Sequence, residues 1–288
     1  MWAAAANRAA AIRVLPYVSS PRTFSTSSYI LEGDDGLVLV DAQFLPSAAL
    51  DAVAHAEAAT GKRVVLAVVL HANPDKFNGA AALEARGIRV LTSAQVAALI
   101  PAVHEKRFRW FGARYAPEYP TKAPALEVFG DRTRTLQVAG LTLRLHVLGQ
   151  GASGAHVVLE HEGHVFVGDL VANGAHSWLE LGDLDAWLAR LDEIEALSPR
   201  SVHPGRGPSG GPELLSGQRR YLEQVRAAVW TAEAEGHSRE EGIARARAAL
   251  VAAFPGYGFE VFLRVGLPAV WDHEAARTAP VAHGAPRG

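Results

Sequence analysis

The pattern of apolar and polar positions changes character along the chain. Up to about residue 100, short apolar runs alternate with helix-length segments. The run at 64–70 contains only Val, Leu and Ala, which is typical of a strand buried on both faces. The expected elements of this part are strands at 12–18, 29–33, 37–41, 64–70 and 88–91, a helix at 45–60, and a helix capped by Asn78 that ends at Gly87.

The second half of the chain shows a different order of signals. Residues 101–135 are rich in Pro, Arg and aromatic residues, and predict a long irregular connection that forms a pocket wall or a lid. Apolar residues at helical spacing predict an amphipathic helix at 183–197. The other expected elements are strands at 141–148, 156–161, 164–168 and 201–203, and helices between 216 and 253.

This order of elements suggests an α/β (α+β) fold in which two central sheets carry helices on both outer faces. We expect residues 12–213 to form this sandwich and residues 214–273 to form a helical extension packed on the same domain. Residues 274–288 have the composition of a disordered tail.

Composition and charge narrow the class of protein. The chain has 288 residues, 49% of them hydrophobic, which is enough for a substantial core. It has no cysteine, so disulfides, thiolate zinc sites and cysteine nucleophiles are excluded. A net charge of −2 without a long basic run argues against nucleic acid as a partner.

No apolar run approaches the ~20 residues that span a bilayer. We therefore expect a cytoplasmic protein with no membrane partner, and a homodimer is one candidate assembly. The N-terminal residues carry Arg8, Arg13 and Arg22 with no acid before Glu32, a composition that faintly resembles a transit peptide. A first strand followed by a Ser/Thr-rich loop is the preferred interpretation.

The candidate chemistry begins where the buried strand at 64–70 ends. The stretch "LHANPDKFNGA" carries His71, Asn73, Asp75 and Lys76 within six residues. A strand that delivers His and Asp into a loop is typical of a metal site, but a lysine ammonium has only donors and cannot bind a metal. The loop therefore marks either a metal site or a former one.

Five stretches in sequence order resemble the metallo-β-lactamase superfamily. "YILEGDDGLVLVDA" is similar to the opening hairpin of that family, which ends in an aspartate, here Asp41. "LHANPDKFNGA" resembles its His-x-His-x-Asp-His loop, and "LGQGASGAHVVLE" lies where a Gly-His-Thr turn usually precedes a strand. "HVFVGDLV" resembles the strand with a metal-bridging aspartate, here Asp169, and "VHPGRG" the final Pro-Gly-His-Gly loop. The resemblance covers roughly residues 29–211 and implies a four-layer αββα sandwich.

The resemblance implies a zinc-dependent hydrolase only in part, because several ligand positions differ. His71, Asp75 and Asp169 match ligand positions of the family. The positions where the family has histidine are occupied by Asn73, Lys76, Gln150 (or Gly151) and Arg206. Zinc prefers about four N or O donors, with several neutral histidines among them, so we expect no zinc pair.

The altered positions suggest a replacement for the metal. Without a metal, Asp75 and Asp169 would repel each other in one pocket, and Lys76 and Arg206 supply nominally the charge of one zinc ion. We therefore predict an ion-pair cluster, Asp75–Lys76–Asp169–Arg206, in place of the second metal. No cofactor is expected, and zinc held weakly by His71, Asp75 and Asp169 is the alternative.

The leading functional hypothesis is a hydrolase-like protein that binds or converts a small anionic or carbonyl-containing molecule. If it is an enzyme, the resemblance implies a hydrolase. The chemistry of the residues allows one catalytic arrangement, in which His71 is the general base and Lys76 or Arg206 stabilises an oxyanion. The alternatives are a hydrolase with a single weak metal and a catalytically silent interaction protein, whose C-terminal helices would form the partner surface.

Other residues are candidates for the ligand pocket. Asn73, Gln150 and His176 are expected to contact the ligand. His156 begins a strand near the missing histidine turn and could substitute for it as a ligand, or could point away. Four aromatic residues have two interpretations, as an apolar pocket wall or as ordinary packing of a long connection: Phe108, Trp110, Phe111 and Tyr115.

Overall fold

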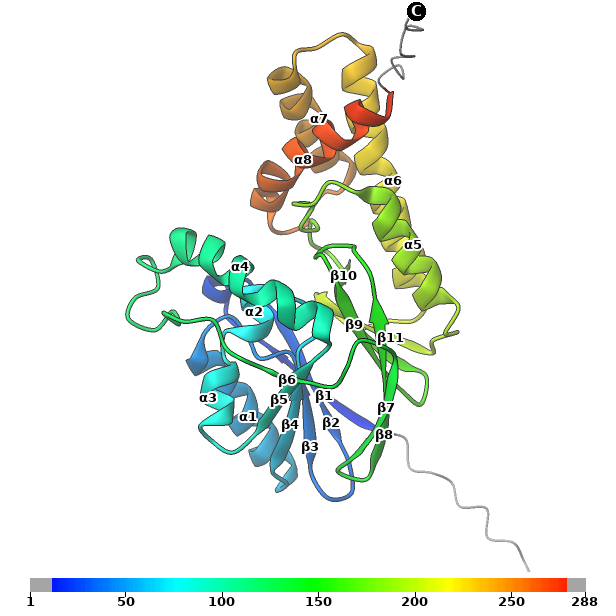
Figure 1. Cartoon of the computed structure of the whole chain (residues 1–288). Coiled ribbons are helices and arrows are strands. Elements are labelled where there is room, and N and C mark those ends of the chain that lie inside the picture. The colour runs from blue at the N-terminus through cyan, green and yellow to red at the C-terminus, as the bar shows by residue number, and fades with distance from the viewer. Residues whose placement is uncertain (1–11, 279–288) are drawn as a thin grey trace, which may run out of the picture.

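The computed structural model describes residues 12–278, in which two sheets lie between two layers of helices (Figure 1). The first sheet has the order β1-β2-β3-β4-β5-β6, and its strands follow one another in sequence. Its first three strands pair antiparallel and the later ones parallel. The strands are β1 (Arg13–Val18), β2 (Ser27–Glu32), β3 (Leu37–Val40), β4 (Val64–Val68), β5 (Arg89–Thr92) and β6 (Glu127–Val128).

The second sheet has the order β11-β10-β9-β8-β7. Strands β10 and β11 pair parallel, while the other neighbours pair antiparallel. Tyr29 on β2 donates a hydrogen bond from its hydroxyl to the carbonyl oxygen of Pro204 on β11 (2.8 Å), which joins the two sheets. The strands are β7 (Arg134–Val138), β8 (Leu141–Leu148), β9 (His156–His161), β10 (His164–Ala172) and β11 (Ser201–Arg206).

The helices cover the two outer faces (Figure 1). The first sheet carries α1 (Pro46–Thr60), α2 (Pro74–Phe77), α3 (Ala80–Glu84) and α4 (Ala94–Phe111), and the 3₁₀ helix η1 (Pro21–Thr23) precedes β2. The second sheet carries α5 (Leu184–Glu195) and α6 (Glu213–Ala234), beyond which α7 (Arg239–Ala253) and α8 (Glu260–Thr278) pack. This layering confirms the predicted αββα sandwich. None of the described helices is long and apolar enough to cross a membrane.

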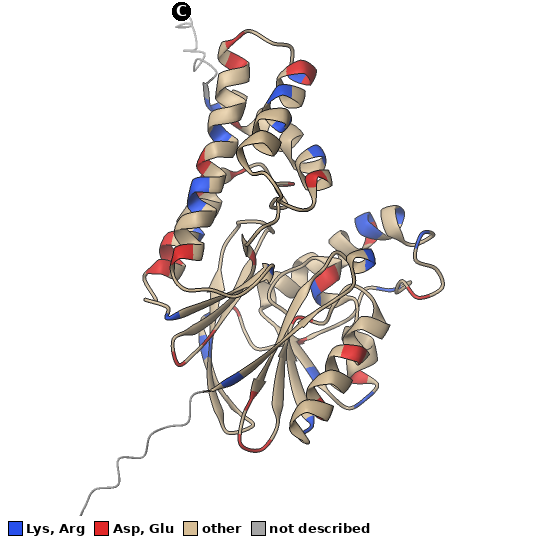
Figure 2. Cartoon of the chain, turned by 180° about the vertical axis from the view of Figure 1, so that it is seen from behind, with Lys and Arg blue, Asp and Glu red and all other residues tan. Residues whose placement is uncertain are grey.

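Strand alternation explains why the second sheet is buried on both faces. On β9, Val157 and Leu159 belong to the same apolar cluster as Tyr29 and Leu31 of the first sheet. Val158, between them, points to the opposite face and packs in the cluster formed with α5 to α8. Most Lys, Arg, Asp and Glu positions lie on the helices and at strand ends (Figure 2).

The predicted break after residue 100 was wrong, because α4 continues through Pro101 to Phe111. A proline inside a helix removes one hydrogen bond and strains the preceding turn, which favours a boundary in the sequence. Here Val96, Ile100, His104 and Arg107 are all buried at helical spacing. Their packing against the rest of the fold outweighs the local effect of the proline. The remaining irregular connection is therefore shorter than the sequence suggested.

Two other expectations about helices also differ from the structure. Asn78 does not cap the following helix; its side-chain amide donates to the carbonyl oxygen of Phe44 (3.1 Å). Helix α8 extends to Thr278, so the first residues of the predicted tail are helical. Glu274 is fully buried there and accepts hydrogen bonds from Arg226 (3.3 Å) and Trp230 (3.0 Å). The rest of the predicted tail, from residue 279, lies outside the described residues.

Candidate functional site

The site lies where strands of both sheets end. Asp41 follows directly after β3, and α2, which carries Asp75 and Lys76, follows β4 after a short turn. Asp169 lies in β10, and Arg206 is the last residue of the neighbouring strand β11. Because β3 and β4 are parallel, as are β10 and β11, their carboxyl ends bring these side chains to one place.

Lys76 forms the centre of a buried acidic cluster. Its ammonium nitrogen lies 3.0 Å from Asp169 Oδ1, 3.3 Å from Asp75 Oδ2 and 3.7 Å from Asp41 Oδ2. The lysine side chain is 0% exposed. Burial alone would lower the pKa of Lys76, but the nearby carboxylates reverse this and raise it, so the side chain is a permanent cation.

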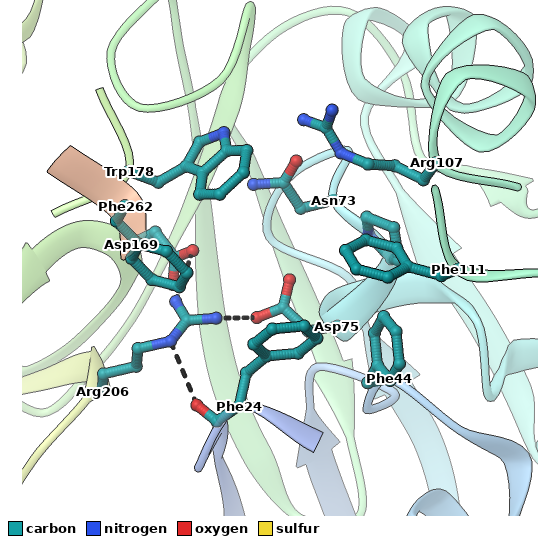
Figure 3. A pocket seen from close by; sticks show the side chains of 11 residues that line it. Phe24, Phe44, Asn73, Asp75, Arg107, Phe111, Asp169, Trp178, Arg206 and Phe262 are labelled. Atoms are coloured by element: carbon teal, nitrogen blue, oxygen red, sulfur yellow. Dashed lines mark hydrogen bonds and ion pairs between the residues drawn. The ribbon is translucent and has the colours of Figure 1, made fainter. Parts of the chain in front are cut away.

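Arg206 bridges two of the same carboxylates (Figure 3). Its Nη1 lies 2.8 Å from Asp169 Oδ2, its Nη2 lies 2.7 Å from Asp75 Oδ2, and its Nε donates to the carbonyl oxygen of Phe24 (3.3 Å). Burial raises the pKa values of Asp75 and Asp169, but the two cations outweigh burial and hold both below the usual range. The predicted cluster of four residues is therefore present; its role as a replacement for a metal stays a prediction.

Asp41 is a third carboxylate of the cluster, which the sequence motifs did not predict. Its Oδ1 accepts the backbone N–H of Leu70 (2.9 Å), and its Oδ2 faces Lys76. Burial raises the pKa of Asp41 to about 6, against the opposing effect of Lys76. The sequence signal was an aspartate directly after a buried strand, but its positive φ of 65° could not be read from the residue types.

Asp41→Asn is expected to change how stability depends on pH. The folded pKa of about 6 exceeds the usual value of 3.8 for an aspartate, so the contribution of Asp41 is fully present below pH 3.8 and is lost as pH rises through 6. The difference between the two pKa values corresponds to roughly 2–3 kcal/mol. Urea unfolding at pH 4.5 and 6.5 should therefore show a smaller loss of stability in Asp41→Asn than in the unaltered protein.

The exposed Asp34 provides the control for this measurement. Asp34→Asn should leave the difference between the two pH values unchanged. Asp75 and Asp169 do not affect this comparison. Because their folded pKa values are lowered, the stability that they contribute is present above the unfolded pKa and is lost only as pH falls through the folded values. Parallel pH profiles for Asp41→Asn and the unaltered protein would contradict the assignment of the raised pKa.

His71 and His156 lie side by side behind the cluster. Their ring centroids are 4.9 Å apart, and both side chains are fully buried. His71 Nε2 is 3.5 Å from Asp169 Oδ2. His156 Nε2 instead accepts the backbone N–H of Ser153 (2.9 Å), and burial lowers its pKa. Neither histidine lines the pocket described next, so the geometry gives no support to the predicted role of His71 as a general base.

A small pocket opens above the cluster, with about 360 Å³ of empty space, part of which is open solvent. Aromatic rings form its walls, and Asp75, Asp169 and Arg206 form its polar side (Figure 3). Asn73 lines it as predicted. The aromatic lining residues are Phe24, Phe44, Phe111, Trp178 and Phe262.

Two predicted ligand contacts lie elsewhere. Gln150 donates to Asp183 (3.2 Å) at the start of α5. His176 is buried against Tyr221, with its Nδ1 3.1 Å from the tyrosine hydroxyl. Neither residue lines the pocket. Residues close to a motif in sequence need not lie close to it in the folded structure. No sequence signal distinguished Gln150 and His176 from Asn73.

Of the four candidate aromatic residues on the long connection, only Phe111 lines this pocket. Its ring packs edge-on against Phe44, with the ring centroids 5.3 Å apart. Tyr115 packs against the other side of this aromatic group, while Phe108 and Trp110 are exposed. Only some residues of α4 face the sheets, and Phe108 and Trp110 are not among them.

An ion pair lies at the edge of the pocket, and no sequence motif indicates it. Arg107 of α4 pairs with Glu180 through both of its terminal nitrogens, one of them at 3.0 Å, and Trp178 donates to the same carboxylate (3.0 Å). Burial raises the pKa of Glu180, but these partners outweigh it and hold that pKa at about 2. Arg107 therefore has no unpaired charge to offer a ligand. Its partner is 73 positions away in sequence, so no motif could reveal the pair.

The acidic cluster does not fit a zinc ion. Zinc needs about four donors at about 2.0–2.2 Å, converging on one point. That point, between the carboxylates of Asp75 and Asp169, lies next to the ammonium of Lys76 and the guanidinium of Arg206. Within residues 12–278, no group of three or more His, Cys, Asp or Glu side chains is arranged to hold a metal ion. The alternative ligand set of His71, Asp75 and Asp169 is therefore not assembled.

A sequence model of the metallo-beta-lactamase superfamily matches residues 21–206. The chain therefore belongs to the metallo-β-lactamase superfamily, as its motifs predicted.

Solved structures share this fold. A metallo-beta-lactamase from Pontibacter korlensis is 21% identical, with a TM-score of 0.52 over 74% of this chain and 94% of that one. One from Hirschia baltica is 20% identical, with a TM-score of 0.54 over 73% and 92%. The metallo-beta-lactamase FIM-1 from Pseudomonas aeruginosa, in a mono-zinc form, is also 20% identical, with a TM-score of 0.54 over 74% and 90%. At these identities the likeness concerns the fold alone. No curated protein matches the chain.

Proposed function

We propose that this chain is a metallo-β-lactamase-fold protein that binds a small, uncharged, carbonyl-containing aromatic molecule without a zinc pair. The observation that carries the proposal is the pocket above the ion-pair cluster. Aromatic rings form most of its wall, and a few polar groups, among them Asn73, Asp75 and Arg206, reach it between the rings (Figure 3). Ligand sites have this composition in general: mostly apolar walls and a few polar groups that fix orientation.

The charges support an uncharged ligand over the anionic one that the sequence also suggested. Three carboxylates face the two cations Lys76 and Arg206, which leaves one negative charge in excess. The other cation that lines the pocket, Arg107, already pairs with Glu180, which Lys106 also contacts. An anion would therefore meet carboxylates without gaining an unpaired cation. A carbonyl group needs only a hydrogen-bond donor.

Burial supports binding rather than metal-free catalysis at the predicted residues. Lys76 and His71 are both 0% exposed, so neither can touch a molecule in the pocket as the structure stands. A general base must come within hydrogen-bond reach of the proton that it removes. Arg206 reaches the pocket, but both of its terminal nitrogens pair with carboxylates.

Calorimetric titration with benzamide in the presence of EDTA tests this function. We expect weak binding that EDTA does not change. Phe111→Ala, which removes a wall of the pocket, should weaken the binding by about tenfold, the effect of losing the burial of an aromatic contact. Phe108→Ala is the matched control, because Phe108 lies on the same helix but is exposed and does not line the pocket.

The proposal fails if benzamide does not bind, or if its binding disappears when metal is removed by EDTA. It also fails if benzoate, which has the same ring and a negative charge, binds more tightly than benzamide. Elemental analysis of the same samples gives the metal content directly, and stoichiometric zinc would favour the single-metal hydrolase instead.

A further inference from the structure

Asn73 has a side-chain amide that the fold does not use. The residue occupies the N-cap position of α2 with φ −128° and ψ 149°, the extended conformation of ordinary N-caps. Asparagine at such a position usually accepts a backbone N–H of the first turn. Here the side chain makes no capping bond, and only the backbone oxygen of Asn73 accepts the N–H of Lys76 (2.9 Å).

The unused amide is directed into the pocket. Asn73 is only 8% exposed and lines the cavity together with Trp178 and Arg107 (Figure 3). Within the described part of the chain, its side-chain oxygen and nitrogen have no hydrogen-bond partner. The amide is therefore free to pair with a ligand without giving up any bond within the protein.

Asp75 offers a further acceptor to the same space. Its Oδ2 accepts from Arg206 (2.7 Å) and Thr26 (3.1 Å). Its other carboxylate oxygen points away from these partners, towards the side of the pocket where Asn73 lies (Figure 3). The pocket thus presents one amide donor, one amide oxygen and one carboxylate oxygen to a ligand.

We propose that Asn73 is the specificity-determining residue of this pocket and that it recognises a primary carboxamide attached to an aromatic ring. The carbonyl oxygen of the ligand would accept from Asn73 Nδ2. Its NH₂ group would donate to Asn73 Oδ1 and to the free oxygen of Asp75. The ring would lie against the aromatic walls, which include Phe111 and Phe262. This inference rests on the proposed function, because it requires a ligand in that pocket.

Two molecules of similar shape are disfavoured by the same geometry. Benzoate has no N–H to donate and brings a negative charge next to Asp75 and Asp169. Acetophenone can accept from Asn73 but leaves the oxygens of Asn73 and Asp75 without a donor. Unpaired buried acceptors weaken binding, so the expected order of affinity is benzamide, then acetophenone, then benzoate.

Calorimetric titration of all three probes distinguishes this inference from ordinary apolar binding. In Asn73→Leu, which has a similar volume and no amide, the affinity for benzamide should fall about tenfold, the size of two lost hydrogen bonds. The affinity for acetophenone should fall less, so the preference between the two should disappear. Asn73→Ala serves as a second variant if leucine disturbs the walls.

Gln150→Leu is the matched control. Gln150 also carries a side-chain amide, but that amide donates to Asp183 outside the pocket. This change should leave the preference for benzamide intact. Benzamide that binds equally well to Asn73→Leu, Asn73→Ala and the unaltered protein would overturn the role of Asn73 while the proposed function stands. Failure of all three probes to bind the unaltered protein would overturn both.

Discussion

Replacing Lys76 with methionine should lower the free energy of unfolding by about 3–5 kcal/mol at pH 7. Methionine has a similar length, so the loss would come from charge rather than from volume. The substitution leaves the carboxylates of Asp41, Asp75 and Asp169 with only Arg206 to balance them in a fully buried place. Removing one partner of a buried ion pair is costly because the other charge stays desolvated. Urea unfolding followed by circular dichroism measures the effect.

Lys62→Met is the control for this experiment. The ammonium of Lys62 lies 3.0 Å from Glu32, but the lysine side chain is 33% exposed. A pair of this kind contributes about 0–1 kcal/mol. Adding Asp169→Asn to Lys76→Met should recover part of the lost stability, because it removes one of the unbalanced carboxylates. A loss below about 1 kcal/mol in Lys76→Met would mean that the buried ammonium does not hold the cluster together.

Arg206→Leu should lower the free energy of unfolding by about 2–4 kcal/mol at pH 7. Arginine has two ionic partners here, Asp75 and Asp169, and leucine can replace neither contact. Arg206 and Lys76 together hold the pKa values of both carboxyl groups below the usual range. That stabilisation is present above the unfolded pKa of 3.8 and is lost as pH falls through the lowered folded values.

The loss caused by Arg206→Leu should therefore shrink as pH is lowered towards 4. Without Arg206, the folded pKa values of Asp75 and Asp169 rise, so these carboxylates take up protons at a higher pH in the variant. Their protonation removes part of the repulsion between them. Urea unfolding at pH 7 and pH 4 measures both losses. Equal losses at the two pH values would show that Arg206 acts through packing alone.

Arg219→Leu is a close control for Arg206→Leu. Arg219 also pairs with two carboxylates, Asp192 at 2.6 Å and Glu195 at 3.1 Å, but all three side chains are at least a quarter exposed. The two arginines therefore have the same number of acidic partners and differ in burial. Arg219→Leu should cost less than about 1 kcal/mol.

The sequence predicted those parts of the fold and site that depend on local patterns. Apolar alternation placed β8 and β9 at their observed residues. The order of the family motifs predicted that Lys76 and Arg206 contact the same two carboxylates, those of Asp75 and Asp169. Each motif lies at a strand end whose position the fold determines.

The remaining features depend on contacts between distant segments. Asp41 joins the cluster through a positive φ, which aspartate adopts only when the surrounding structure favours it. Arg107 lines the pocket because α4 continues past Pro101, and its partner Glu180 comes from the other half of the chain. Residue types alone carried no signal for either contact.

The buried ammonium of Lys76 also has a consequence for how the stability of the fold depends on metal. Where a metal ion balances such carboxylates, its binding contributes to the free energy of folding, and the folded population then depends on the concentration of free metal. Lys76 is part of the polypeptide, so the positive charge that balances Asp75 and Asp169 is present as soon as the chain is made. The stability that comes from Lys76 therefore does not depend on the concentration of free zinc.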